Sequence, residues 1–197
     1  MYALTSDGVL YSAGSNQNGE LGDGTDNDEL TPIQAALNAK VVSIEAGAHH
    51  ACAVDDHHRT WCWGFGRDAE LFVPSSNTRF APQVVDAVSN VAKIAAGDAH
   101  TCALSTTNQL TCVGYNGTGQ LGDGVRTSQL VPVAIPLTNT TAIIAGRDQA
   151  TAVSAGGSET CAQTAAGSYC WGGDVFGALG DGVVDYGTPR GVNLPCP

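Results

Sequence analysis

Six of the seven cysteines in this sequence form three closely spaced pairs, and their thiols carry its clearest potential chemistry. The pairs are Cys52 with Cys62, Cys102 with Cys112, and Cys161 with Cys170. The first pair is symmetric about His57 and the second about Thr107, whereas the third is one residue closer. Symmetric positions on a β-hairpin are cross-strand neighbours with Cβ atoms ~4.5–5.5 Å apart, which is close to disulfide reach. The spacing therefore predicts three disulfides, each inside one hairpin.

Two other interpretations of the paired cysteines stay open at this point. Cysteine is often buried as a free thiol, and a reducing compartment would keep all three pairs in that form. Zinc is a weaker interpretation, because pairs on separate repeats do not form a compact cluster of four ligands. The seventh cysteine, Cys196, has no partner in this pattern, so we expect a free thiol or a bond to another chain or to further sequence.

Metal-ligating residue types occur in two places. The acidic stretch "DGTDNDE" contains Asp23, Asp26 and Asp28, and clustered carboxylates are suitable calcium ligands. Their spacing differs from an EF-hand loop, and a solvated acidic loop is the alternative. The stretch "DDHHR" spans residues 55–59, but adjacent histidines on a turn point in different directions, which disfavours a metal site. We expect no resident metal or cofactor.

The elements that position these residues recur along the chain. Four segments match one template and begin at Tyr2, Cys52, Cys102 and Cys161, with steps of 50, 50 and 59 residues. Three of them end in Leu-Gly-Asp-Gly. A period near 50 with glycine and aromatic signatures is typical of a propeller or solenoid. Each unit holds about four runs of strand length, which favours a four-stranded propeller blade.

Aligned positions in the repeats suggest shared structural roles. Gly8, His58 and Asn108 occupy one hairpin-turn position, where a positive φ is expected. His50 and His100 share another position, and we expect both to be buried and hydrogen-bonded within the fold. Tyr11, Trp61 and Tyr169 align, as do Trp63 and Trp171 two residues later, and period two places both sets on one sheet face between blades.

The pattern "AGDAHTCAL", "LTCVGYNGTGQLGDG" and "LVPVAI" resembles the regulator of chromosome condensation repeat, and the resemblance covers essentially the whole chain. It implies a β-propeller, which in this family typically has seven blades. The cysteine pairs look like a variant found in extracellular bacterial members. The second copy departs from the pattern, because "FGRDAELFVPSSN" lacks the Gly-Asp-Gly, and we expect its loop to be remodelled.

We therefore predict an all-β fold of four-stranded propeller blades, with about 3.7 repeats present in a single domain over residues 1–197. The approximate repeats are 1–47, 48–97, 98–156 and 157–197. An open arc would leave apolar blade faces exposed to solvent. We expect the end faces, carrying Leu4, Val9 and Tyr11 at one end and Tyr169 and Trp171 at the other, to be covered. Self-association or continuation in a longer chain would cover them.

Loops on a rigid scaffold are frequent binding sites, and one region here is irregular. About nine extra residues lie between Ile143 and Cys161 relative to the other repeats, and their register is ambiguous between "AGRDQATAV" and "AGGSETCAQ". The candidate binding residues in this insertion are Arg147, Asp148, Gln149 and Ser154. Two Asn-X-Thr sequons, at Asn116 and Asn139, are possible glycosylation sites in a secreted protein.

Charge and missing motifs narrow the function. The formal charge is −11, from 8 Lys and Arg against 19 Asp and Glu, which disfavours nucleic acid and anionic membranes as partners. No apolar run reaches the ~18 residues of a membrane span, and no basic-then-apolar leader opens the chain. The leader has therefore been removed, or the chain is a piece of a longer one. No phosphate-binding loop, dinucleotide fingerprint or zinc-hydrolase motif occurs, so we expect no enzymatic activity.

The leading functional hypothesis is a non-catalytic, secreted, extracellular binding or adhesion module that presents its loops to a protein or glycan. A self-assembling structural subunit of an extracellular layer or fibre is the alternative. The resemblance also allows a regulator that acts as a guanine-nucleotide exchange factor. Paired cysteines disfavour a nuclear exchange factor, because disulfides rarely persist in the nucleus.

Overall fold

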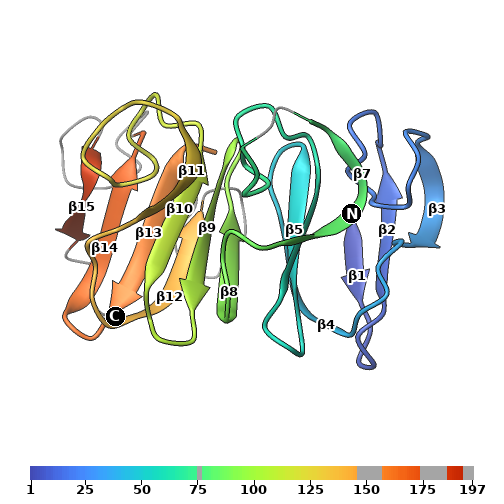
Figure 1. Cartoon of the computed structure of the whole chain (residues 1–197), viewed down its shortest axis with the longest axis horizontal. Helices are drawn as coiled ribbons and strands as arrows, with labels where there is room; N and C mark the ends of the chain where they lie inside the picture. The colour runs from blue at the N-terminus through green and yellow to red at the C-terminus, as the bar shows by residue number, and fades with distance from the viewer. Residues whose placement is uncertain (75–76, 146–156, 174–185, 193–197) are drawn as a thin grey trace.

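The computed structural model describes residues 1–74, 77–145, 157–173 and 186–192, and these contain fifteen strands in four antiparallel sheets (Figure 1). The first sheet contains β1 (Tyr2–Leu4), β2 (Leu10–Gly14) and β3 (Glu29–Gln34). The second contains β4 (Val41–Ala46), β5 (His50–Asp55), β6 (Thr60–Gly64) and β7 (Arg79–Val85). The third contains β8 (Val91–Ala96), β9 (His100–Ser105), β10 (Leu110–Gly114) and β11 (Gln129–Ala134). The fourth contains β12 (Thr140–Ala145), β13 (Glu159–Thr164), β14 (Gly167–Gly172) and β15 (Tyr186–Val192).

The four sheets stand side by side as propeller blades, and their strands follow chain order within each sheet (Figure 1). The first strands of neighbouring sheets are adjacent, β4 beside β8 and β8 beside β12, so each sheet runs from an inner first strand to an outer last strand. The first sheet has three strands, which match the second to fourth strands of the other sheets. This confirms an all-β partial propeller.

The ends of the sheets differ in the length of their connections (Figure 1). At one end, here called the loop end, lie the long connections between the third and fourth strands, at residues 15–28, 65–78 and 115–128. At the other, the hairpin end, lie tight turns between the second and third strands. The turn residues Gly8, His58 and Asn108 have φ values of 88°, 61° and 63°, as the repeat alignment predicts.

The three cysteine pairs are joined as disulfides in the structure. Each pair stands directly opposite in its hairpin register, with Cα–Cα distances of 4.2, 4.1 and 4.1 Å. The free-thiol and zinc interpretations are therefore not those of this structure. The strand that carries Cys161 is β13, so "AGGSETCAQ" supplies the second strand of the fourth sheet, whereas "AGRDQATAV" lies almost entirely outside the described residues.

Three apolar clusters fill the three junctions between successive sheets. The first contains Leu10, Val41, Ala51, Ala53 and Trp63; the second contains Val54, Leu71, Phe72, Val91 and Val113; and the third contains Leu104, Leu110, Leu121, Ile143 and Trp171. Trp63 and Trp171 are fully buried, as expected of aromatic residues between blades.

The expectation that Trp171 and Tyr169 lie on the last end face is wrong. Both side chains pack into the third junction, against the third sheet. Leu4 likewise packs into the first junction rather than onto the first end face. Successive strand residues point to opposite faces, so Cys170 lies on the side of the fourth sheet opposite Trp171.

Each outer strand carries a proline where its pairing with the third strand is interrupted by a bulge. The four prolines are Pro32, Pro82, Pro132 and Pro189, in β3, β7, β11 and β15. Proline has no backbone N–H, and within sheets it is confined to edges and bulges.

Candidate functional site

The loop end is the candidate functional site, and a buried asparagine holds its first loop in shape. Asn16 is fully buried. Its Nδ2 donates to Asp23 Oδ1 and to the Thr25 carbonyl oxygen, each at 3.0 Å, and its Oδ1 accepts the Leu21 N–H at 2.9 Å. One amide thus joins three points of a single loop, so the loop has one shape before any partner binds.

The third loop has the same anchor. Asn116 is fully buried, and its Nδ2 donates to Asp123 Oδ1 and to the Val125 carbonyl oxygen, each at 3.0 Å. Its Oδ1 accepts the Leu121 N–H at 3.0 Å. A glycan on Asn116 would replace these contacts, so the folded structure does not support this predicted glycosylation site. Asn139 is exposed, with a φ of 57°, and its predicted modification stays a prediction.

The Leu-Gly-Asp-Gly turns that begin at Leu21 and Leu121 connect the first and third loops to the next sheet. A Cβ on Gly22 would lie 2.8 Å from Trp63 Nε1, and one on Gly122 would lie 2.5 Å from Trp171 Nε1. Each indole therefore rests on a glycine of the preceding loop. Trp63 also donates to the Glu20 carbonyl oxygen at 2.8 Å.

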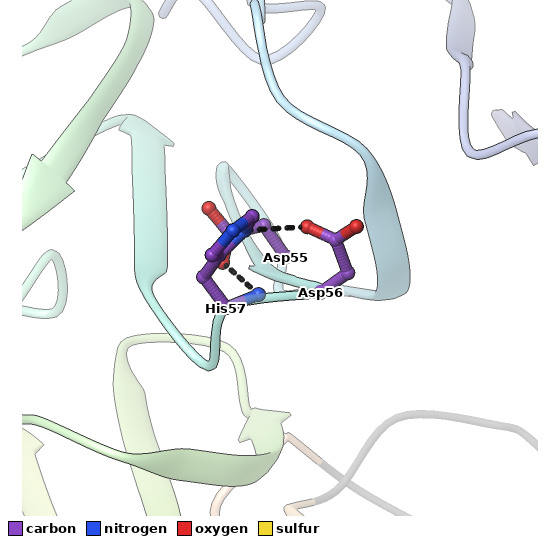
Figure 2. A group of neighbouring side chains, drawn as sticks. All are labelled: Asp55, Asp56 and His57. Atoms are coloured by element: carbon purple, nitrogen blue, oxygen red, sulfur yellow. Dashed lines mark hydrogen bonds and ion pairs between the residues drawn. The ribbon is translucent and has the colours of Figure 1, made fainter.

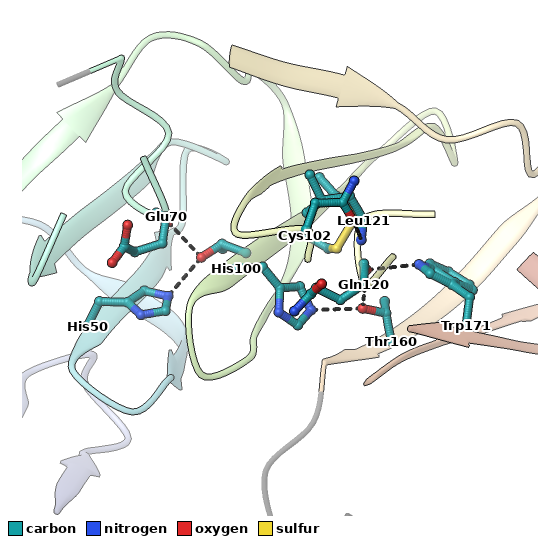
Figure 3. The surroundings of a disulfide bond; sticks show 11 residues. His50, Glu70, His100, Cys102, Gln120, Leu121, Thr160 and Trp171 are labelled. Carbon is teal, nitrogen blue, oxygen red and sulfur yellow. Dashed lines mark hydrogen bonds between the residues drawn. A yellow bond between two sulfur atoms is a disulfide. The ribbon is translucent and has the colours of Figure 1, made fainter. Parts of the chain in front are cut away.

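Trp171 of β14 likewise donates to the Gln120 carbonyl oxygen at 2.9 Å (Figure 3). A second set of hydrogen bonds reaches the outer strand of the next sheet. The Gly24 N–H donates to the Phe80 carbonyl oxygen at 2.9 Å, and the Gly124 N–H to that of Gly187 at 2.7 Å. These two turns therefore make contacts between blades.

The second loop has the backbone conformation of the first loop at two positions, although its side chains there are larger. Ala69 and Phe72 take φ values of 65° and 60°, where the first loop has glycines. Phe72 takes the position of the glycine on which a tryptophan packs at the other junctions. Val113 of the third sheet takes the position of that tryptophan, so a large and a small side chain are exchanged. The expected remodelling thus affects side chains, whereas the backbone at these two positions is conserved among the loops of this chain.

Two histidines connect the sheets just beneath the loop end (Figure 3). His50 Nε2 lies 2.8 Å from Thr101 Oγ1, which donates to the Glu70 carbonyl oxygen at 2.7 Å. His100 Nε2 lies 2.8 Å from Thr160 Oγ1, which in turn donates to Gln120. Burial lowers the pKa of His50 to about 3 and that of His100 to about 4, so both rings are neutral near pH 7.

These histidine–threonine pairs do not form a catalytic nucleophile and base. Both threonines are fully buried, and each hydroxyl proton is already donated to a loop carbonyl. A nucleophile must be reachable by substrate and must give its proton to the base. The pairs are structural, as the sequence predicted for the histidines.

Asp55, Asp56 and His57 form the one group of three potential metal ligands that is found among the described residues (Figure 2). The Asp55 carboxylate is already engaged: Oδ1 accepts the N–H groups of His57 and Arg59, and Oδ2 accepts Arg59 Nε at 2.7 Å and Trp61 Nε1 at 3.0 Å. Burial alone would raise the Asp55 pKa, but these hydrogen bonds outweigh it and hold the pKa below its usual value. Asp55 therefore braces the hairpin turn, and both of its oxygens are engaged by protein groups.

The predicted calcium ligands do not gather into a cluster of that kind. Asp23 Oδ1 accepts from Asn16 and from the Thr25 N–H at 3.0 Å, and its Oδ2 accepts the Thr25 hydroxyl at 2.7 Å. Asp28 Oδ1 accepts the Asn16 N–H at 2.8 Å. Asp26 is exposed. The structure thus uses two of the three carboxylates to order the first loop, which favours the alternative of a solvated acidic loop.

The side chains that the loop end presents to solvent come from all three described loops. They include Asp26 and Asn27 from the first, Arg67 from the second, and Tyr115, Val125 and Thr127 from the third. Tyr115 is 42% exposed and Val125 is 47% exposed. The predicted binding residues Arg147, Asp148, Gln149 and Ser154, and Cys196, lie outside the described residues. No helix long and apolar enough to span a membrane occurs in the described part of the chain.

Family models for the regulator of chromosome condensation (RCC1) repeat match residues 7–54, 57–104 and 91–120. The chain is similar to the ultraviolet-B receptor UVR8 of Arabidopsis thaliana, with 35% identity over 88 residues, which are 44% of this chain and 20% of the receptor. The match therefore spans a fifth of that relative.

Two solved propellers share the fold. Human WBSCR16 superposes with a TM-score of 0.84 and 24% identity, over 98% of this chain and 50% of that one. Prp20p from Saccharomyces cerevisiae, described with its binding to Gsp1p and histones, has a TM-score of 0.80 and 19% identity over 98% of this chain and 48% of its own. The chain thus spans about half the length of either structure.

Proposed function

Because the chain belongs to the regulator of chromosome condensation repeat family, we propose that it is a non-catalytic binding module whose loop end contacts a protein partner. The observation that carries this proposal is the set of rigid loops anchored by Asn16 and Asn116. Loops that are ordered before binding lose less conformational entropy in a complex.

The exposed side chains of the third loop support a protein partner. Tyr115 and Val125 combine an aromatic and an aliphatic surface. Tyrosine is enriched at the energetic centres of protein interfaces, where it supplies large contact area at low entropic cost. Prp20p, which has the same fold, binds Gsp1p and histones, so a protein partner is in keeping with the family.

We further propose that the protein works outside the reducing cytosol. The three hairpin disulfides support this, because disulfides form and persist in oxidising compartments. The net charge of −11 disfavours chromatin DNA as a direct partner. Alkylation of native protein followed by peptide mapping tests the compartment: recovery of the six cysteines as free thiols would contradict it.

A second candidate function, a self-assembling structural subunit, is favoured by one observation on the outer strands. Phe80 of β7 lies against Gly19 of the preceding loop, whereas its counterpart Leu30 in β3 is 98% exposed. An apolar side chain at a contact position is therefore available to another blade. Light scattering separates the two hypotheses, since a structural subunit forms open assemblies that grow with concentration.

Site-specific photo-crosslinking tests the binding hypothesis. The photoreactive amino acid p-benzoylphenylalanine replaces Tyr115 at the loop end or, as the matched control, Thr107 in the exposed turn at the hairpin end. Both proteins are illuminated in extracellular medium from the source cells, and adducts are identified by mass spectrometry.

We expect adducts to a distinct protein from position 115 and none to that protein from position 107. Equal adducts from both positions, or none from either, would contradict a binding surface at the loop end. An adduct between two copies of this chain would support the structural subunit, and a glycan adduct would replace the protein partner.

A further inference from the structure

The hydrogen bonds between the blades fix which nitrogen of each buried histidine carries the proton. Thr101 Oγ1 donates its proton to the Glu70 carbonyl oxygen, because a carbonyl can only accept. The contact between His50 Nε2 and Thr101 Oγ1 must then use the Nε2 proton of the ring. The same logic, through Thr160 and Gln120, gives His100 an Nε2 proton.

The other nitrogen of each ring lies against the backbone of a glycine. A Cβ on Gly47 would lie 2.6 Å from His50 Nδ1, and one on Gly97 would lie 2.4 Å from His100 Nδ1. Each Nδ1 edge therefore rests on a glycine. His100 Nδ1 is buried without a hydrogen-bond partner. A second proton there would be a buried donor on a buried charge, which costs several kcal/mol in general.

We propose that these two histidine–threonine pairs make the contacts between blades sensitive to acid. Neutral His50 and His100 hold the second, third and fourth sheets together, and protonation of the rings separates the sheets. The sheets themselves stay intact when the junctions open, because Cys52–Cys62 and Cys102–Cys112 staple their central hairpins. The acid form is then a string of ordered blades with exposed junction surfaces.

Other titratable groups lie around the rings and must be counted. His49 precedes His50 on the same turn, Asp68 and Glu70 lie on the loop after β6, Asp98 precedes β9, Glu159 lies in β13, and Glu45 lies in β4. Burial raises the pKa of Glu70 to about 7 and also raises that of Glu45. Burial tends to raise the pKa values of Asp23 and Asp55 as well, but their hydrogen bonds prevail and lower them.

The histidines and the glutamates change the stability of the closed form in opposite directions as the pH falls. A histidine whose pKa is lowered by folding binds its proton only in the open form, so stability is full above pH 6.5 and falls by up to about tenfold per pH unit below it. A carboxyl whose pKa is raised binds its proton in the closed form, so Glu70 adds up to about tenfold per unit as pH falls from 7 toward 4.5. Glu45, whose pKa is also raised, acts in the same direction as Glu70, so the share of the histidines is the difference between the wild type and a variant that lacks the two rings.

The test is the change in the unfolding equilibrium constant between pH 6.0 and 5.0, measured by urea titration with tryptophan fluorescence. Trp171 lies in the third junction, which the His100 contact closes, and reports its opening, whereas Trp63 lies in the first junction, which holds neither histidine contact. The variant is His50→Gln with His100→Gln, since glutamine keeps a donor near the Nε2 position but does not titrate. The matched control is His49→Gln with His57→Gln, both exposed.

Over this pH unit we expect the unfolding equilibrium constant of the wild type and of the control to rise up to about 100-fold relative to that of the double variant, which is up to about tenfold for each histidine. In the double variant at 50 and 100 we expect stability to increase as the pH falls, because Glu70 and Glu45 then act without the histidines. An unchanged pH dependence in that variant would overturn the proposal. Far-ultraviolet circular dichroism of the wild type at pH 4.5 should retain its strand signal while tryptophan fluorescence shifts.

If the double variant does not fold, nuclear magnetic resonance of the wild-type histidine rings decides the question. His50 and His100 should not titrate between pH 7 and 5. A midpoint near 6.5 for either buried ring would refute the proposal, because a ring that titrates normally in the closed form cannot open the junction.

Discussion

Gly22 forms the floor on which the indole ring of Trp63 rests, across the junction between the first and second sheets. Gly122 and Trp171 repeat this relationship at the third junction. The glycine in the Leu-Gly-Asp-Gly turn is thus required twice, for its φ of 69° and for the space that its missing Cβ leaves.

Gly122→Ala should destabilise the fold more than Gly124→Ala. Both glycines have positive φ values, 79° and 89°, so both substitutions carry a backbone cost of about 1 kcal/mol. At 122 the new Cβ also meets the Trp171 ring at 2.5 Å, whereas at 124 the nearest atom lies at 3.6 Å. We expect an additional cost of about 1–3 kcal/mol at 122, measured by urea denaturation. Equal costs would show that the indole moves aside freely.

Phe72 and Val113 should be energetically coupled, because they exchange volume at the second junction. Phe72→Gly leaves a cavity and should cost about 3–5 kcal/mol, and Val113→Trp overpacks the junction at about 1–3 kcal/mol. The double variant rebuilds the glycine–tryptophan contact of the other junctions, so its cost should fall below the sum by about 2 kcal/mol.

Urea denaturation of the four proteins in this cycle gives the coupling energy. Phe72→Gly combined with Trp171→Val is the control, since these residues lie in different clusters. Strict additivity in the Phe72–Val113 cycle would mean that the two side chains do not compensate each other.

Asn116→Ala should lower the free energy of unfolding by about 2–4 kcal/mol. The substitution leaves the Leu121 N–H and the Val125 carbonyl oxygen without their partner, at about 1–3 kcal/mol for each buried group. Asn38→Ala, at an exposed position, is the control and should change stability by less than about 0.5 kcal/mol. Thermal denaturation compares the two; a small effect at 116 would mean that water replaces the amide.

Asp55→Asn should destabilise the hairpin turn of the second sheet and disturb Trp61. The asparagine cannot accept from Arg59 Nε and Trp61 Nε1 as the carboxylate does, and bonds to a charged group contribute about 1.5–3 kcal/mol. Because folding lowers the Asp55 pKa, the stabilisation is present above pH 4 and is lost as pH falls through the folded value. The wild-type advantage over the variant should therefore shrink at pH 3.

The metal question at this turn has its own measurement. Each carboxylate oxygen of Asp55 accepts two hydrogen bonds from protein groups. EDTA should therefore leave the midpoint of thermal unfolding unchanged. A lower midpoint with EDTA, restored by one divalent ion, would identify a metal that the hydrogen bonds do not predict.

Local patterns in the sequence were sufficient to predict the repeat architecture. The spacing of Cys102 and Cys112 identified a hairpin and its register, and Asn108 identified the turn, because both depend on residues close in the chain. The direction in which each blade face points was not available from spacing. Trp171 was therefore assigned to an end face although it is buried against the third sheet.

The loop end was predicted only in part for the same reason. Asn16 and Asn116 recur 100 residues apart in the sequence, and this repetition was the available signal for a structural anchor. The pairing of Gly22 with Trp63 joins different sheets, so it requires knowing which blade follows which. The acidic residues Asp23 and Asp28 were only a weak calcium candidate, and their oxygens accept hydrogen bonds from the loop itself.

The prolines of the outer strands limit how this protein can aggregate. An outer strand with free N–H groups can pair with the edge of another molecule and extend a sheet indefinitely. Pro32, Pro82, Pro132 and Pro189 interrupt that edge in every blade, each at a bulge. Fibrils built by adding strands at the rim are therefore disfavoured, so contacts between copies are directed to blade faces and loops, where side-chain shape selects the partner.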